Sequence, residues 1–103
     1  AQEGHSAALE ILVKAGCNVN QARKDRSTPA IIAAQNGQTA ALDILVKAGC
    51  LVNQASKSGA TPAYIAARRG QTTALDILVK AGCLVNHADE NGQTPAFVAA
   101  ENG

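Results

Sequence analysis

Short apolar stretches with helical spacing alternate along the chain with polar stretches. In one of them Leu42, Leu45 and Val46 fall at positions i, i+3 and i+4, which places them on one face of a helix. A shorter apolar stretch, 30–36, lies just before it. Neither predicted helix is long enough to be stable alone in water, so each must bury its stripe against a neighbour. The pattern predicts an all-α protein built from pairs of short packed helices.

The residues that flank these stretches mark the helix ends. Thr28 followed by Pro29 is typical of a helix start, because threonine caps free backbone N–H groups and proline does not need one. Gly37 predicts the end of the first helix in a left-handed conformation. Thr39 then opens the second helix and Gly49 ends it. The chain is therefore expected to turn back sharply between two antiparallel helices.

A polar stretch of little helical character follows each predicted pair. In residues 51–60 the run Lys57-Ser58-Gly59 is a turn signal. We expect this stretch to project as a finger, a β-hairpin, that leads to the next Thr-Pro. Three asparagines just after the second helices are expected to stabilise the turn there: Asn20, Asn53 and Asn86.

The whole pattern repeats at a step of 33 residues without an insertion. Four glycines mark the step: Gly4, Gly37, Gly70 and Gly103. The segment 41–50 returns unchanged at 74–83. Such units stack in a row, held by contacts between nearest neighbours.

A unit with Thr-Pro opening its first helix, Ala-Ala inside it, and Leu-Val-Lys-Ala-Gly followed by Val-Asn closing the second resembles the ankyrin repeat. The resemblance covers essentially the whole chain. It implies an α-solenoid of helix-turn-helix units, with β-hairpin fingers at one edge and a concave groove lined by the first helices. The predicted units are a partial repeat 1–22 (the end of a first helix and a full second helix), repeats 23–55 and 56–88, and a partial repeat 89–103.

The chain departs from the usual pattern of that family. The family usually has Leu-His after Thr-Pro, whereas this chain has Ala followed by Ile31, Tyr64 or Phe97, and these larger residues are expected to help fill the space. Arg26 stands where the other fingers have glycine, so it is strained if the position needs a positive φ. These departures favour a fragment of a longer natural array over an engineered one.

Composition narrows the possible functions. The chain is 47% hydrophobic, which excludes wholesale disorder, and its net charge is +1 with 2% aromatic residues, which argues against nucleic acid as a partner. No apolar run is long enough to span a membrane. No set of catalytic residues recurs and no phosphate-binding glycine loop is present, so we expect no enzyme activity and no cofactor.

Three cysteines recur at the repeat step: Cys17, Cys50 and Cys83. Packed helices lie about 8–10 Å apart, too far for equivalent cysteines to form a disulfide or to share a metal ion. We therefore expect all three to be small, buried and reduced, which favours an intracellular, cytoplasmic setting.

Differences between the near-identical units concentrate at the finger tips and at the end of each first helix. The candidate partner-binding residues are Lys24, Asp25, Arg26, Ser27, Gln35, Asn36, Lys57, Ser58, Ala60, Tyr64, Arg68, Arg69, Glu90, Asn91, Gln93, Glu101 and Asn102. Unconstrained drift of exposed positions is an equal alternative. For Tyr64 we favour packing between repeats over a role as an anchor.

The candidate surface is basic over its first half and acidic at its far end. A protein partner with an acidic patch would fit it, and Arg68 and Arg69 could form bidentate pairs with carboxylates. The leading hypothesis is a protein-binding scaffold, and the alternative is a structural spacer without a specific ligand in the groove. Neither end of the array has a polar cap, so we expect either that the parent array is longer or that the ends associate with one another between molecules.

Overall fold

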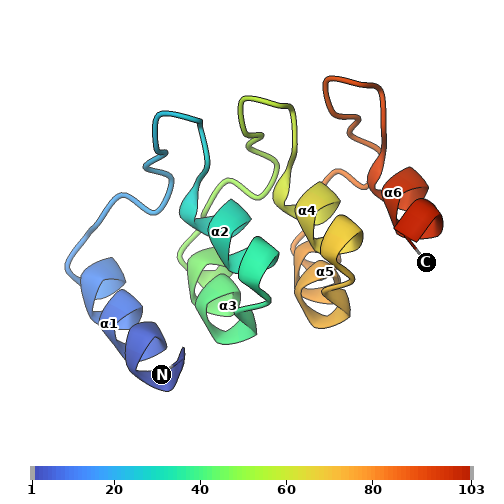
Figure 1. Cartoon of the computed structure of the whole chain (residues 1–103). Coiled ribbons are helices and arrows are strands. Elements are labelled where there is room, and N and C mark those ends of the chain that lie inside the picture. Colours follow the sequence, from blue (N-terminus) through green and yellow to red (C-terminus); the bar gives the residue numbers. More distant parts are fainter. Residues whose placement is uncertain (1, 103) are drawn as a thin grey trace.

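The computed structural model describes residues 2–102 of the chain, and side chains from Ser6 onward. The described part contains α-helices and loops. Its helices are α1 (Gln2–Lys14), α2 (Pro29–Asn36), α3 (Thr39–Lys47), α4 (Pro62–Arg69), α5 (Thr72–Lys80) and α6 (Pro95–Asn102) (Figure 1).

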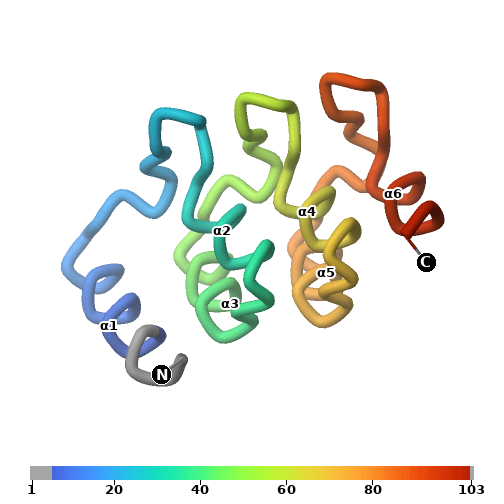
Figure 2. Tube along the Cα trace, in the orientation of Figure 1, coloured from blue at the N-terminus to red at the C-terminus, as the bar shows by residue number. Residues whose placement is uncertain are grey.

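The helices form two layers that run along one row. The inner layer is α2, α4 and α6, each in contact with the next, and the outer layer is α1, α3 and α5. Within a unit α2 packs on α3 and α4 packs on α5. The chain advances from one end of the row to the other, over extents of 39 × 25 × 23 Å (Figure 2). The predicted all-α solenoid of stacked helix pairs is confirmed, and the exact unit boundaries stay a prediction.

The inner helices begin and end as their sequences predict. The side-chain oxygen of Thr28 accepts a hydrogen bond from the N–H of Ile31 at 3.3 Å, and Thr61 caps α4 in the same way at 3.2 Å. Gly37 and Gly70 end these helices in the left-handed region, at φ 66° and 67°. These caps fix where each short helix starts and stops, so neighbouring stripes stay in register.

An apolar cluster runs through the units between the inner and outer helices. Leu45 and Leu78 are 1% and 0% exposed and belong to the same cluster, together with Cys50 and Cys83. Both cysteines are free, as expected. The prediction is wrong for Cys17, which is exposed, because no inner helix of its own unit covers it in the described chain.

The first helix also differs from the prediction. Gly4 was expected to separate the end of one helix from the next, but α1 continues through it as a single helix of 13 residues. Glycine permits a left-handed stop without imposing one, and within residues 2–102 no inner helix precedes α1.

The fingers have the shape of hairpins without a β-ladder. Each is closed by two backbone hydrogen bonds. In the first finger, Arg23 N–H donates to the carbonyl of Ser27 at 3.0 Å and Arg26 N–H donates to that of Arg23 at 2.9 Å, and the same pair of bonds recurs in the other two fingers. No residue between 2 and 102 adopts a β-strand, because such a tight loop leaves no room for further paired residues.

The asparagines after the outer helices bond across units and not within their own turn. The side-chain oxygen of Asn20 accepts a hydrogen bond from Leu51 N–H at 2.7 Å, and that of Asn53 accepts one from Leu84 N–H at 2.6 Å. Asn20 and Asn53 therefore stabilise a turn after an outer helix, as expected, but it is the turn of the following unit. Asn20 and Asn53 each tie their own unit to the following one.

Candidate partner-binding surface

Three fingers project side by side from the same edge of the row (Figure 1). We call residues 23–27, 56–60 and 89–93 the finger edge. Neighbouring fingers are joined by backbone hydrogen bonds, from Lys57 N–H to the carbonyl of Asp25 at 2.9 Å and from Glu90 N–H to that of Ser58 at 3.0 Å. The fingers therefore form a continuous edge and not three independent loops.

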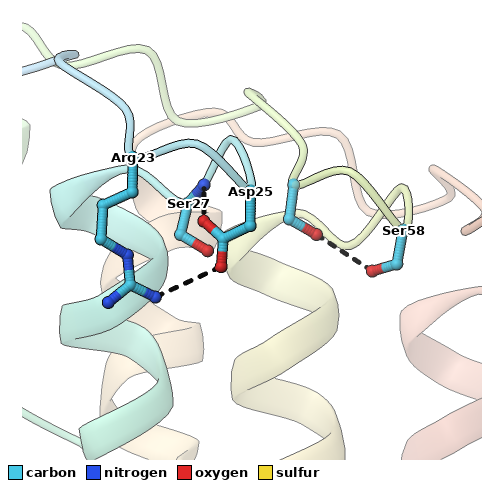
Figure 3. Close-up of polar contacts among 5 residues, drawn as sticks. Arg23, Asp25, Ser27 and Ser58 are labelled. Atoms are coloured by element: carbon cyan, nitrogen blue, oxygen red, sulfur yellow. Dashed lines mark hydrogen bonds and ion pairs between the residues drawn. The ribbon is translucent and has the colours of Figure 1, made fainter.

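A carboxylate shapes the first finger (Figure 3). Asp25 Oδ1 accepts a hydrogen bond from Ser27 N–H at 2.9 Å, and Asp25 Oδ2 lies 3.3 Å from Arg23 Nη2. The hydrogen bond from the Ser27 backbone, helped by Arg23, holds the pKa of Asp25 below its usual value. Asp25 is thus engaged within its own finger.

The third finger uses a carboxylate from a different position. Asp89 Oδ1 accepts hydrogen bonds from Asn91 N–H at 2.8 Å and from Gln93 N–H at 2.9 Å. The bond from Gln93 is the main reason that the pKa of Asp89 lies below its usual value. The second finger has no carboxylate and pairs the hydroxyls of Ser56 and Ser58 at 3.0 Å (Figure 3).

Arg26 has a φ of 66°, which confirms the strain expected from its place in the finger. Gly59, at the equivalent place, has a φ of 85°, and a Cβ there would lie 2.9 Å from the backbone nitrogen of Glu90. Gly92 has a φ of 78° with open space around it. Only at Gly59 does the next finger add a steric need for glycine.

Tyr64 packs between units and is 5% exposed. It belongs to a buried cluster drawn from α2, α4 and α6. Its hydroxyl donates to Gln93 Oε1 at 3.3 Å, the Arg68 guanidinium lies 5.8 Å from its ring centroid, and burial raises the pKa of its hydroxyl. Packing between repeats, the favoured interpretation, is confirmed. Ser27 and Ala60 are also buried, so these three candidates present little surface to a partner.

A groove of about 370 Å³ lies where α4 ends and α5 begins. Arg68 and Arg69 line it, together with Leu75 of α5 and Asn102 of α6. Asn102 Nδ2 donates to the carbonyl of Arg68 at 3.2 Å, so this candidate joins two units. Both arginines are exposed, which leaves their guanidinium groups open to a ligand.

The cations of the fingers and of the groove beside Arg68 and Arg69 differ from those on the outer helices in whether they are paired with a carboxylate. Lys14, Lys47 and Lys80 each pair with a carboxylate one helical turn away, at 3.3, 3.0 and 3.0 Å. Within residues 6–102, five other cations have no carboxylate within 4 Å: Lys24, Arg26, Lys57, Arg68 and Arg69. Of the basic residues in the fingers, Arg23 alone has such a partner.

The remaining candidates are mostly open to solvent. Asn36, Glu90, Asn91 and Glu101 are exposed, while Gln35 and Gln93 are half-buried. Among the residues from 6 to 102, no cluster of His, Cys, Asp and Glu is suited to bind a metal ion. None of the helices found between 2 and 102 has the length and apolarity that a membrane crossing demands.

The fold and this surface define a class of protein: a solenoid of helix pairs with a continuous edge of projecting loops. A family model described as ankyrin repeats (3 copies) matches residues 1–89 and 48–103. The chain belongs to the ankyrin repeat family. Members of this family are generally protein–protein interaction modules and generally non-catalytic. No curated protein sequence gives a significant match.

Proposed function

We propose that this chain binds an acidic segment of a protein partner along the finger edge and the adjoining arginine groove. The observation that carries the proposal is the group of unpaired cations on this side. A cation that already has a partner must give it up to bind a carboxylate, whereas these five have none within the described residues. Arg68 and Arg69 are suited to grip carboxylates in a bidentate manner.

The experiment measures the binding of synthetic acidic peptides and of versions in which Gln and Asn replace Glu and Asp. The double variant Arg68→Glu/Arg69→Glu should bind the acidic peptides at least about tenfold more weakly, because hydrogen bonds between charged groups contribute about 1.5–3 kcal/mol each. Binding of the unaltered chain should weaken as salt is added.

The matched control is Lys47→Glu/Lys80→Glu, which makes the same change in charge on the outer helices. Each of those lysines belongs to an exposed pair on adjacent turns. Reversing its charge should cost about 0.3–0.5 kcal/mol for the lost pair and a similar amount for the like-charge pair that replaces it. Affinity should be largely retained. Equal weakening by both variants would mean that only net charge matters, and unchanged binding by the arginine variant would remove the groove from the proposal.

A structural spacer is the second candidate function. Its support is the series of bonds that lock neighbouring units together, such as those of Asn20 and Asn53 to the following unit. A spacer would bind no acidic peptide at any salt concentration. The free, buried Cys50 and Cys83 support a reducing, intracellular setting for either function.

A further inference from the structure

Equivalent positions of the three fingers form a row along the finger edge (Figure 1). Lys24, Lys57 and Glu90 occupy the same place in the first, second and third fingers, because each follows the one before by the repeat step of 33 residues. The backbone repeats this relation: Lys57 N–H bonds to the carbonyl of the residue after Lys24, and Glu90 N–H bonds to that of the residue after Lys57. We call these three side chains the tip row.

The tip row carries two positive charges followed by a negative one. All three residues are exposed, and among residues 6–102 none of the three lies within 4 Å of an opposite charge. Lys57 is exposed although the third finger lies beside it, so exposure at this place does not depend on the lack of a neighbour. The tip row therefore offers an ordered set of charges to a ligand.

Charges beside the tip row change sign at the same unit. Arg68, at the end of α4, is exposed, and its equivalent one unit along is Glu101, which is also exposed. Asp89 adds a second carboxylate to the third finger. A ligand that lies along the row thus meets positive charge at the second unit and negative charge at the third.

The spacing of the tip row selects the backbone conformation of such a ligand. Packed helices set the repeat step at about 8–10 Å, and the bonds between fingers leave no room for a much wider step at the edge. A polyproline II segment presents every third side chain on one side, after an advance of about 9.3 Å. Side chains on one face of a β-strand recur after about 6.6 Å or about 13 Å, and those on one face of an α-helix after about 5–6 Å or about 10.5 Å. Of these, only the polyproline II repeat falls within the step.

We infer that the partner segment is a polyproline II stretch with a charged residue at every third position, in the order acidic, acidic, basic. The acidic side chains face Lys24 and Lys57, and the basic one faces Glu90. The inference rests on the proposed function and adds to it the conformation and the charge order of the partner. A segment that runs in the opposite direction reverses the order but keeps an acidic residue in the middle, so the middle residue is decisive.

Three synthetic peptides of one composition, with blocked ends, test the inference. The matched peptide is Glu-Pro-Pro-Glu-Pro-Pro-Lys. The exchanged peptide, Glu-Pro-Pro-Lys-Pro-Pro-Glu, places its lysine against Lys57 in either direction. The compressed peptide, Glu-Pro-Glu-Pro-Lys-Pro-Pro, keeps the charge order and shortens the step. In NMR titrations at low salt, the matched peptide should bind the unaltered chain about tenfold more tightly than either of the others, because only it pairs all three charges.

A variant with its own charges exchanged should reverse the preference. Lys57→Glu/Glu90→Lys keeps the net charge and changes the tip row to positive, negative, positive. It should bind the exchanged peptide about tenfold more tightly than the matched one. Both side chains are exposed, so the urea midpoint should stay the same. The control Asp43→Lys/Lys47→Glu exchanges a pair on α3 and should keep the preference for the matched peptide.

The outcomes separate this inference from the proposed function. Equal affinity of the unaltered chain for the matched and exchanged peptides would overturn the charge order, as would a tip-row variant that still prefers the matched peptide. Tight binding of the compressed peptide would overturn the polyproline II conformation. In each of these cases acidic peptides still bind, and the proposed function stands. If no acidic peptide of any design binds, the proposed function and this inference both fail.

Discussion

Cations on the outer helices are paired with carboxylates, whereas most cations on the finger edge are not. Lys47 and Lys80 lie 3.0 Å from Asp43 and Asp76 on their own helices. Lys24, Arg26 and Lys57 on the finger edge have no such partner within the described residues. Charges that are already paired contribute a little to helix stability, about 0.3–0.5 kcal/mol per pair, and offer little to a ligand. The difference agrees with the proposal that the unpaired cations serve recognition, while the paired ones stabilise their helices.

The two regions also tolerate sequence change differently. The segment 41–50 is identical to 74–83, because each position in it meets the same neighbours one unit along. All three fingers are closed by the same backbone hydrogen bonds. The side chains that bond within them differ: a carboxylate in the first and third fingers and two hydroxyls in the second. Variable residues can therefore occupy the edge as long as each finger closes.

Replacing a leucine of the helices should have the largest effect. Leu78→Ala removes a side chain that is 0% exposed and leaves a cavity in the shared core. The free energy of unfolding, measured with urea, should fall by about 2–5 kcal/mol. Leu84→Ala is the control, since Leu84 is 55% exposed and should change stability by less than about 0.5 kcal/mol. Equal losses would contradict the division between core and surface.

Gly59→Ala, in the second finger, should have the next largest effect on stability. Gly59→Ala places a Cβ 2.9 Å from the backbone nitrogen of Glu90 and keeps a left-handed φ, so the finger contact must open. Gly92→Ala meets no neighbouring atom and only places alanine in a left-handed backbone conformation, which costs about 1–2 kcal/mol. Urea unfolding should show the greater loss for Gly59→Ala. A greater loss for Gly92→Ala would mean that the fingers do not support one another.

Glycine at position 26 should stabilise the chain. Arg26→Gly relieves a left-handed residue and should raise the free energy of unfolding by about 1 kcal/mol. Arg26→Ala removes the same charge and keeps the strain, so it should give no such gain. If both variants stabilised the chain equally, the cost at this position would lie in the charge and not in the backbone.

Acid should loosen the third finger, and this effect should be the smallest. The pKa of Asp89 lies below its usual value, so its carboxylate stabilises the folded finger above the usual pKa and loses that effect as pH falls through the lowered one. NMR should show the amide protons of Asn91 and Gln93 shifting over that acidic range. Asp89→Asn should abolish the shift. Amides that titrate in this variant would exclude the Asp89 carboxylate as the cause.

Much of the fold can be predicted from the sequence, because its signals are local. Thr61 and Gly70 bound a helix by their own chemistry, and the repeat step places equivalent stripes together. The contacts that could not be predicted depend on what lies beside a residue. The bond between Asn53 and Leu84 N–H depends on the next unit, which the sequence around Asn53 does not reveal. Cys17 and Cys50 occupy equivalent positions in the repeat, but Cys50 is buried and Cys17 is exposed.

The candidate surface was predicted less completely than the fold. Variation and charge pointed to the fingers, but they could not show that Asp25 is engaged within its own finger. Nor could they show that Ser27 and Ala60 are buried, since exposure follows from how the fingers close.

The central claim is that the unpaired cations of the finger edge and of the arginine groove recognise an acidic partner, and that their side chains contribute little to stability. Its most direct test is the affinity for an acidic peptide of a variant with five changes: Lys24→Ser, Arg26→Gly, Lys57→Ser, Arg68→Gln and Arg69→Gln. Binding should disappear while the urea midpoint stays the same or rises. Retained binding, or a loss of stability as large as that of Leu78→Ala, would contradict the account.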